Sequence, residues 1–319
     1  NMFLELERSL YPAVPVTFRK DGSIDYKAQA SYAKWMDTQP ITGVALWAHT
    51  GRGLLLSSSD REQVFNTWRE ALSKDKQIIC GVGAKAEDAT SNEDFVEKAL
   101  EMGKHAKKLG ADGILCYAPV YFRGKKDQDE WIVKYHTALD SLGLPMVLFY
   151  LYEAAGGITY SLDVLRELFA LKNAVSIKMA TLDSVMTYQD VANMLAKEFP
   201  DKVLITGEDR MFGYTIARGG KGALVGIGSA FCRMQKAMID AYYDKDYKQF
   251  VELMLLVDKL AEVTFIQPME GYIERMLHVL VAQGLVPKEA SFDPYGPGVT
   301  DKERKAIEEV VKELEGLGW

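Results

Sequence analysis

The chain has 319 residues, of which 48% are hydrophobic and 26% are charged, a balance typical of a globular protein with a large core. Its formal net charge of −7 argues against an unaided nucleic-acid-binding protein, because such proteins present a basic surface. No apolar run approaches the roughly 18 residues of a membrane span, and the N-terminal segment lacks a signal-peptide hydrophobic region. We therefore expect a cytoplasmic protein that binds neither nucleic acid nor membrane.

Short apolar runs alternate with longer amphipathic stretches along the first 228 residues. The apolar runs predict eight strands, at residues 13–18, 42–48, 77–83, 113–119, 145–151, 174–180, 202–207 and 222–228. The amphipathic stretches predict helices between them, for example at 61–73, 94–108, 131–142 and 184–198. Near-continuous apolar strands joined by helices are typical of a parallel sheet covered on its outer face.

Eight strand–helix units in this length predict a (β/α)8 TIM barrel with additional C-terminal helices, an α/β fold. A doubly wound sheet is the structural alternative, but it normally has fewer strands and a G-x-G-x-x-G sequence opening a helix near the N-terminus. After Gly228 the alternation stops, and only helical patterns and one Pro- and Gly-rich loop follow. We therefore divide the chain into a barrel, residues 1–228, and a helical region, residues 229–319, that completes it.

The cysteine and histidine patterns indicate neither a disulfide framework nor a metal site. The cysteines are far apart, and two of them lie in apolar strand-like runs, which predicts reduced core thiols: Cys80, Cys116 and Cys232. The four histidines are dispersed and form no H-x-H or H-E-x-x-H pattern. Glu208 and Asp209 could help to bind a divalent ion, but a structural role fits them better. We expect no metal and no other cofactor.

Lys178 is the sharpest candidate for a catalytic residue, because the active sites of such barrels lie at the C-terminal ends of the strands. It follows the apolar residues 174–177, in a setting where lysine is rarely buried without a partner. Burial would disfavour the charged amine, and a neutral amine can attack a carbonyl carbon to form a Schiff base. The residues alone leave two alternatives, an ion pair with Glu208 or Asp209 and a phosphate contact.

Two further segments bring polar groups to predicted strand ends. Tyr121 follows the fourth strand, where its hydroxyl could relay protons to a reacting carbonyl, or where it is simply an amphipathic side chain. Residues 49–53, HTGRG, follow the second strand. Successive backbone N–H groups in such a turn can bind a carboxylate, and the alternative is an ordinary loop. His49 is either a base or a donor within this loop.

Five segments, taken in order, resemble one family: VTFRKDGSIDYKA, HTGRG, APVYF, SIKMA and GGKGALVGIGSA. Their order and spacing are similar to those of the dihydrodipicolinate synthase and N-acetylneuraminate lyase family of class I aldolases. The resemblance covers nearly the whole chain. It implies a (β/α)8 barrel with extra C-terminal helices, commonly assembled as a homotetramer. We therefore expect a homo-oligomer, either a dimer or a tetramer.

The resemblance also implies roles for individual residues. Lys178 would form the Schiff base, and Tyr121 would relay protons. The G-x-T-G-E loop of the family matches the segment AHTGR, so Thr50 and Gly51 would hold the carboxylate of a keto acid. Leu224, in the eighth strand, would line the keto-acid pocket.

Three residues depart from the pattern of the family. His49 replaces a small or hydroxyl-bearing residue and would act as a base or block the pocket. Arg52 replaces a glutamate. After the fifth strand the synthases show Y-N-x-P-x-R-T-G, whereas this chain has Ala155 in place of the arginine that recognises a second carboxylate. Losing that bidentate group should cost most of the affinity for a dicarboxylate.

Together these features predict a class I aldolase or lyase whose partners are small molecules, a 2-keto acid and an aldehyde. Pyruvate or a related keto acid would condense with Lys178, and a carbon–carbon bond would then be cleaved or formed reversibly. A sugar-acid or hydroxylated aldehyde fits the loss of the arginine better than aspartate semialdehyde does. The alternatives are a non-catalytic keto-acid-binding protein on the same scaffold, and a sugar-phosphate enzyme that uses RGGKGA and GIGS to hold phosphate.

Overall fold

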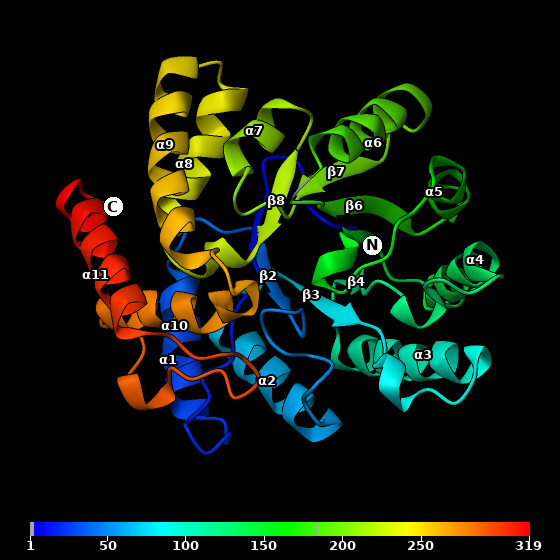
Figure 1. Ribbon diagram of the computed structural model, residues 1–319, viewed down its shortest axis with the longest axis horizontal. Coiled ribbons are helices and arrows are strands. Elements are labelled where there is room, and N and C mark those ends of the chain that lie inside the picture. Colours follow the sequence, from blue (N-terminus) through cyan, green and yellow to red (C-terminus); the bar gives the residue numbers. More distant parts are fainter. Residues whose placement is uncertain (1–2, 183) are drawn as a thin grey trace.

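The computed structural model describes residues 3–182 and 184–319 and contains a barrel of parallel strands surrounded by helices (Figure 1). The strands are β1 Leu10–Pro12, β2 Gly43–Leu46, β3 Gln77–Val82, β4 Gly113–Cys116, β5 Met146–Leu151, β6 Ala174–Ala180, β7 Val203–Thr206 and β8 Gly222–Val225. They pair in the order β1-β8-β7-β6-β5-β4-β3-β2, and a parallel bridge between Ala13 and Ala45 joins the two ends of this series. The predicted (β/α)8 barrel is confirmed.

Helices follow the strands and continue beyond them. Those that alternate with the strands are α1 Tyr26–Asp37, α2 Ser58–Ala71, α3 Asn92–Leu109, α4 Gln128–Asp140, α5 Leu162–Phe169, α6 Val185–Glu198, α7 Phe212–Ala217 and α8 Cys232–Tyr243. The last three are α9 Tyr247–Thr264, α10 Tyr272–Ala282 and α11 Asp301–Gly316, which gather at one side of the barrel in Figure 1. None of the helices in the described part of the chain is long and apolar enough to cross a membrane.

Local sequence signals explain where many of these helices begin. A side-chain oxygen just before the helix accepts a hydrogen bond from an N–H of the first turn at seven of them, and the capping residues are Asp25, Ser57, Ser91, Ser161, Ser184, Asp246 and Thr300. Such caps satisfy backbone donors that have no partner within the helix. Several strand-to-helix connections at the rim of the barrel therefore end at a defined capping residue, where the helix begins.

The predicted first strand, residues 13–18, is wrong. The strand that pairs with β8 is β1, Leu10–Pro12, and only Ala13 and Val14 extend its contacts toward β2. The run 13–18 is apolar because it is buried, but Pro15 has no N–H to contribute to a sheet. Further along, the Thr17 N–H donates to the Gln29 side chain, at 2.9 Å, instead of to a strand.

The inside of the barrel is filled by its own apolar cluster, separate from the larger cluster between strands and helices. Alternation along β6 turns Ser176, Lys178 and Ala180 toward the same face of the sheet. Ala180 belongs to the inner cluster, so Lys178 also faces the inside, near the C-terminal rim. Register places Lys178 beside Phe149 of β5 and Ile205 of β7.

Two other predictions concern the interior and the domain boundary. Cys80, Cys116 and Cys232 are free and buried, as predicted from their apolar surroundings. The predicted boundary after residue 228 falls within a short 3-10 helix, η4 Gly226–Ser229, and α8 follows at once. The division into a barrel and a helical region stays a prediction.

Candidate active site

A pocket opens at the C-terminal ends of the strands, where barrel enzymes bind their substrates. Its lining comes from the ends of β2, β5, β6 and β7, from the start of η4, and from the segment between α9 and α10. Polar and charged side chains in the lining include His49, Thr50, Lys178, Asp209 and Tyr272. The rest is mostly apolar, which excludes water from part of the pocket.

Lys178 lies in this pocket with only 8% of its surface exposed. Its Nζ is 4.4 Å from the centre of the Phe149 ring, and among the described residues it forms no salt bridge. Burial lowers the pKa of Lys178 to about 8, against the opposing effect of the Asp209 and Glu208 carboxyl groups. A substantial part of the amine is therefore neutral near pH 7 to 8, as a nucleophilic lysine requires.

The two carboxyl groups at the end of β7 have different surroundings. Glu208 is fully buried and accepts hydrogen bonds from the N–H groups of Thr181 and Leu182, so it holds the loop after β6. Asp209 lines the pocket and accepts from the N–H of Ile227 at 2.9 Å. Burial raises the pKa of Glu208 to about 7 and that of Asp209 to about 6. In the part of the chain that the structure describes, neither carboxyl group forms an ion pair with Lys178, although both lie near enough to oppose the lowering of its pKa.

Gly207 allows the lysine side chain to lie against β7. A Cβ atom added at Gly207 would be 2.4 Å from Cε of Lys178 and 2.9 Å from its Cγ. Both distances are shorter than a van der Waals contact, so a larger residue would displace the amine. Glycine at this position thus helps to set where the amine points.

The loop after β2 contributes three of the predicted site residues. His49 and Thr50 line the pocket, and Thr50 is buried. The Gly51 N–H donates to the carbonyl oxygen of Ala48 at 3.1 Å, so the turn already uses this donor. A carboxylate bound there by Gly51 would have to share or replace that bond, and this role stays a prediction.

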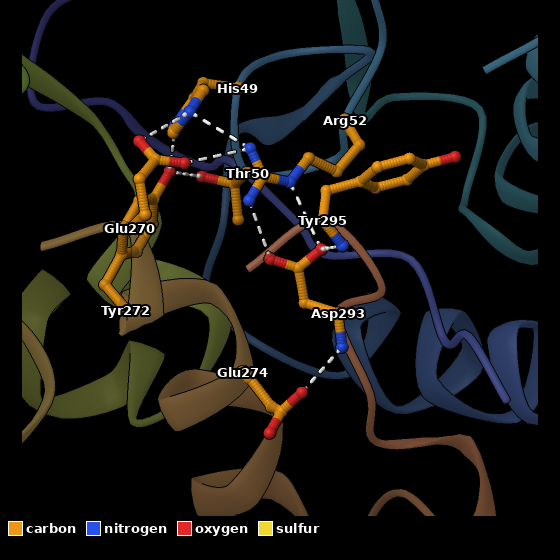
Figure 2. Close-up of polar contacts among 8 residues, drawn as sticks. All are labelled: His49, Thr50, Arg52, Glu270, Tyr272, Glu274, Asp293 and Tyr295. Carbon is orange, nitrogen blue, oxygen red and sulfur yellow. Dashed lines mark hydrogen bonds and ion pairs between the residues drawn. The ribbon is translucent and has the colours of Figure 1, made fainter. Parts of the chain in front are cut away.

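Arg52 is engaged by acidic side chains of the C-terminal region (Figure 2). Its guanidinium donates to Asp293 at 2.7 and 3.2 Å and to Glu270 at 3.0 Å. Arg52 and Asp293 are buried, whereas Glu270 is half exposed. Arg52 therefore ties the loop after β2 to the segments that precede α10 and α11.

The structure places Tyr121 and Leu224 outside the lining of the pocket. Tyr121 lies in η2, Val120–Phe122, where its ring stacks on Phe95 at 5.5 Å and Lys125 lies over its face. Leu224 is fully buried in the apolar cluster inside the barrel. The proton-relay role of Tyr121 and the lining role of Leu224 stay predictions.

Sequence reasoning missed the part of the pocket that comes from the end of α9 and the start of α10. Phe265, Met269, Glu270 and Tyr272 all line it. The rule that led to the other candidates considers only strand ends, and these residues follow no strand. The available signal was a group of polar and aromatic residues just before α10, which is too common a pattern to single out a site.

The phosphate-binding alternative does not fit the structure. RGGKGA leads into β8 at its N-terminal end, whereas GIGS forms η4 at the other end of the same strand. The Ile227 N–H in η4 already donates to the carboxylate of Asp209, and a carboxylate there repels phosphate. Among residues 3–182 and 184–319, no group of three or more His, Cys, Asp or Glu side chains is arranged to hold a metal ion.

The model of the dihydrodipicolinate synthetase family matches residues 6–314, nearly the whole chain. The chain belongs to this family. The resemblance stated from five sequence segments is therefore confirmed, and membership makes the protein a lyase of the aldolase class.

Similar proteins include both named and uncharacterised members of the family. The 4-hydroxy-tetrahydrodipicolinate synthase of Bartonella quintana is 25% identical over 257 residues, 80% of this chain and 82% of that protein. An uncharacterised DapA-like lyase of Pyrococcus horikoshii is 26% identical over 299 residues, 92% and 96% of the two chains. The structure of a sialic acid aldolase from Ruminococcus gnavus matches with a TM-score of 0.82 at 17% identity, over 98% of each chain. That likeness supports the fold.

Proposed function

We propose that this protein is a class I aldolase or lyase in which Lys178 forms a Schiff base with pyruvate or a related 2-keto acid. The observation that carries the proposal is a buried lysine, free of salt bridges among the described residues, facing a pocket at the strand ends. Its neutral amine attacks the keto carbon and water leaves. The resulting iminium withdraws electrons, so a bond at the adjacent carbon can break or form.

The second substrate in our proposal is a hydroxylated aldehyde. Among the described residues that line the pocket, Lys178 is the only lysine or arginine. The lining also includes Ala155, which the resemblance matches to the arginine of the synthases. The carboxyl groups of Asp209 and Glu270 also line the pocket. Carboxylates accept hydrogen bonds from hydroxyl groups and repel a second carboxylate, which favours a hydroxylated partner.

We also propose that the protein assembles as a homo-oligomer, a dimer or a tetramer. The support is the resemblance to a family that commonly does so. Light scattering on the eluting protein should give two or four times the chain mass of 35.7 kDa. A mass of one chain would contradict this.

Reduction with borohydride in the presence of pyruvate tests the main proposal. Reduction converts a pyruvate Schiff base into a stable carboxyethyl-lysine, which peptide mass spectrometry locates. We expect the adduct on Lys178. If neither pyruvate nor a bulkier keto acid gives an adduct on folded protein, the proposal fails, and a keto-acid-binding protein without turnover becomes the better interpretation.

The rate of adduct formation should depend on pH through the lysine. Because the pKa of Lys178 is about 8, the fraction of neutral amine falls about tenfold for each pH unit below 8 and levels off above it. We expect initial trapping rates with pyruvate to rise from pH 6 to 8 and to plateau by pH 9. A rate that keeps rising to pH 10 would mean that burial does not lower the pKa of this amine.

Gly207→Ala should impair the same step. The added methyl group overlaps the Lys178 side chain and moves its amine, and displacements of about 1 Å can cost about 100-fold in rate. We expect trapping to slow to that extent, with an unchanged circular dichroism spectrum. Gly316→Ala, where a Cβ meets open space, is the matched control. Equal rates in the two variants would show that the lysine tolerates the methyl group.

A further inference from the structure

The hydroxyl of Tyr272 contacts two of the polar side chains that line the pocket, His49 and Thr50. Tyr272 begins α10 and lines the pocket together with Lys178. Its hydroxyl lies 2.8 Å from Nδ1 of His49 and 3.0 Å from Oγ1 of Thr50. Figure 2 draws both contacts as dashed lines. Burial raises the pKa of the phenol well above its usual range, so the group holds its proton at neutral pH.

The partners of His49 determine which of its nitrogens carries the proton. Nε2 lies 3.2 Å from a carboxylate oxygen of Glu270 and 3.3 Å from Nη1 of Arg52, which can only donate. We place the imidazole proton on Nε2, toward the carboxylate, because the hydrogen bond to an ionised acceptor is the stronger of the two. The His49 ring and the Arg52 guanidinium lower the pKa of Glu270 to about 2, so this group is a carboxylate that accepts a hydrogen bond from Nε2. Nδ1 is then unprotonated and accepts from the hydroxyl of Tyr272, while Thr50 donates to the phenol oxygen. A carboxylate that orients a histidine toward a hydroxyl is a known arrangement for activating that hydroxyl.

Tyr272, His49 and Glu270 form a connected series of polar groups that leads from the pocket to solvent. Tyr272 is 8% exposed, whereas the side chains of His49 and Glu270 are 38% and 51% exposed. A proton received by His49 can therefore exchange with water without crossing the pocket. Tyr121, by contrast, is stacked on Phe95, and the ring next to Lys178 belongs to Phe149, which has no hydroxyl.

We propose that Tyr272, and not Tyr121, transfers the proton at the reacting carbon of the keto acid, with His49, oriented by Glu270, as the base behind it. The inference rests on the proposed Schiff base at Lys178. In the forward step the C3–H bond of the iminium breaks and its proton goes to the phenol oxygen. The phenol proton moves to Nδ1 of His49, and the C–H electron pair forms the C2=C3 bond as the iminium becomes an enamine. Reversal of the transfers protonates the same carbon.

Exchange of the pyruvate methyl protons with deuterium oxide, followed by proton NMR, measures this step without an aldehyde. Tyr272→Phe should slow exchange by about 100-fold or more, the usual contribution of such a group. Borohydride trapping on Lys178 should persist in the same variant, which also shows that it is folded. Tyr247→Phe, at an exposed position on α9, is the matched control and should exchange at the wild-type rate.

Two variants test the base behind the tyrosine. His49→Ala should slow exchange, and added imidazole should restore part of the rate because His49 is accessible to solvent; imidazole should not restore Tyr272→Phe. Glu270→Gln should lower the maximal exchange rate without changing the pyruvate concentration that gives half of it. A lower maximal rate at an unchanged half-saturating concentration would mean that Glu270 orients the base and does not contribute to binding of the keto acid.

The outcomes separate the two proposals. No adduct in the wild-type protein would overturn the Schiff-base function and this assignment with it. Normal trapping with wild-type exchange in Tyr272→Phe would overturn the tyrosine assignment alone. Loss of exchange in Tyr121→Phe, with exchange retained in Tyr272→Phe, would return the role to Tyr121.

Discussion

Lys178→Met should abolish borohydride trapping with pyruvate and lower any aldolase or lyase turnover to background, a loss of at least about 1,000-fold. Methionine is close to lysine in length and shape but has no amine to form the Schiff base. Turnover with a trial set of keto acids and hydroxylated aldehydes would measure the loss. Lys172→Ala, which removes an exposed lysine just before β6, should leave trapping unchanged. Persistent trapping at another lysine in Lys178→Met would refute the assignment.

The same variant should be at least as stable as the wild-type protein. A lysine pKa lowered from 10.5 to about 8 corresponds to about 3 kcal/mol, since one pKa unit is worth about 1.4 kcal/mol. The folded protein therefore binds this proton more weakly than the unfolded chain, and the cost is present in full below pH 8 and disappears above pH 10.5. Methionine removes the cost. Urea unfolding at pH 7 measures it, and a destabilised Lys178→Met would indicate a structural role for the amine.

Arg52→Ala should cost about 3–5 kcal/mol of unfolding free energy, because it leaves the buried carboxylate of Asp293 without its cation. Two guanidinium nitrogens contact that carboxylate, and the side chains of Arg52 and Asp293 are 6% and 1% exposed. Urea unfolding at neutral pH gives the free energy. Arg304→Ala, which breaks an exposed pair with Asp301, should cost less than about 1 kcal/mol.

A double variant distinguishes the buried charge from the lost packing. Arg52→Met with Asp293→Asn removes both charges, and it should recover much of the stability lost in Arg52→Ala. If the double variant is as unstable as Arg52→Ala, the cost lies in the shape of the cluster instead. If Arg52→Ala is within 1 kcal/mol of the wild-type protein, the ion pair does not hold the C-terminal segment.

Local patterns in the sequence were sufficient to predict the barrel and to single out its buried lysine, Lys178. Buried parallel strands read as apolar runs, so seven of the eight predicted strands overlap observed ones. The prediction of the first strand failed because residues 13–18 are apolar and buried without forming a strand, and because Pro15 has no N–H with which to pair. The second strand ends earlier than predicted because Trp47 has a positive φ of 60°, a conformation that a strand cannot continue. Lys178 was identifiable because a charged residue interrupts an otherwise apolar run.

The rest of the pocket could not be predicted from those patterns. The contacts of His49 and Arg52 with Glu270, Tyr272 and Asp293 span more than 200 positions of the chain. Neither helical nor strand periodicity carries information about which loops meet at that separation. Arg52 was recognised as a departure from the family pattern, but its partners explain it: the arginine is held by acidic groups of the C-terminal region.

The ionic contact between Arg52 and Asp293 also affects how the site is completed during synthesis. All eight strands, and Lys178 with them, have been translated by residue 225, yet Glu270, Tyr272 and Asp293 are still to come. A nascent chain of that length carries Lys178 but lacks Glu270 and Tyr272, two of the residues that line the pocket with it. The reactive lysine therefore gains its full surroundings only when the last quarter of the chain docks onto the loop after β2.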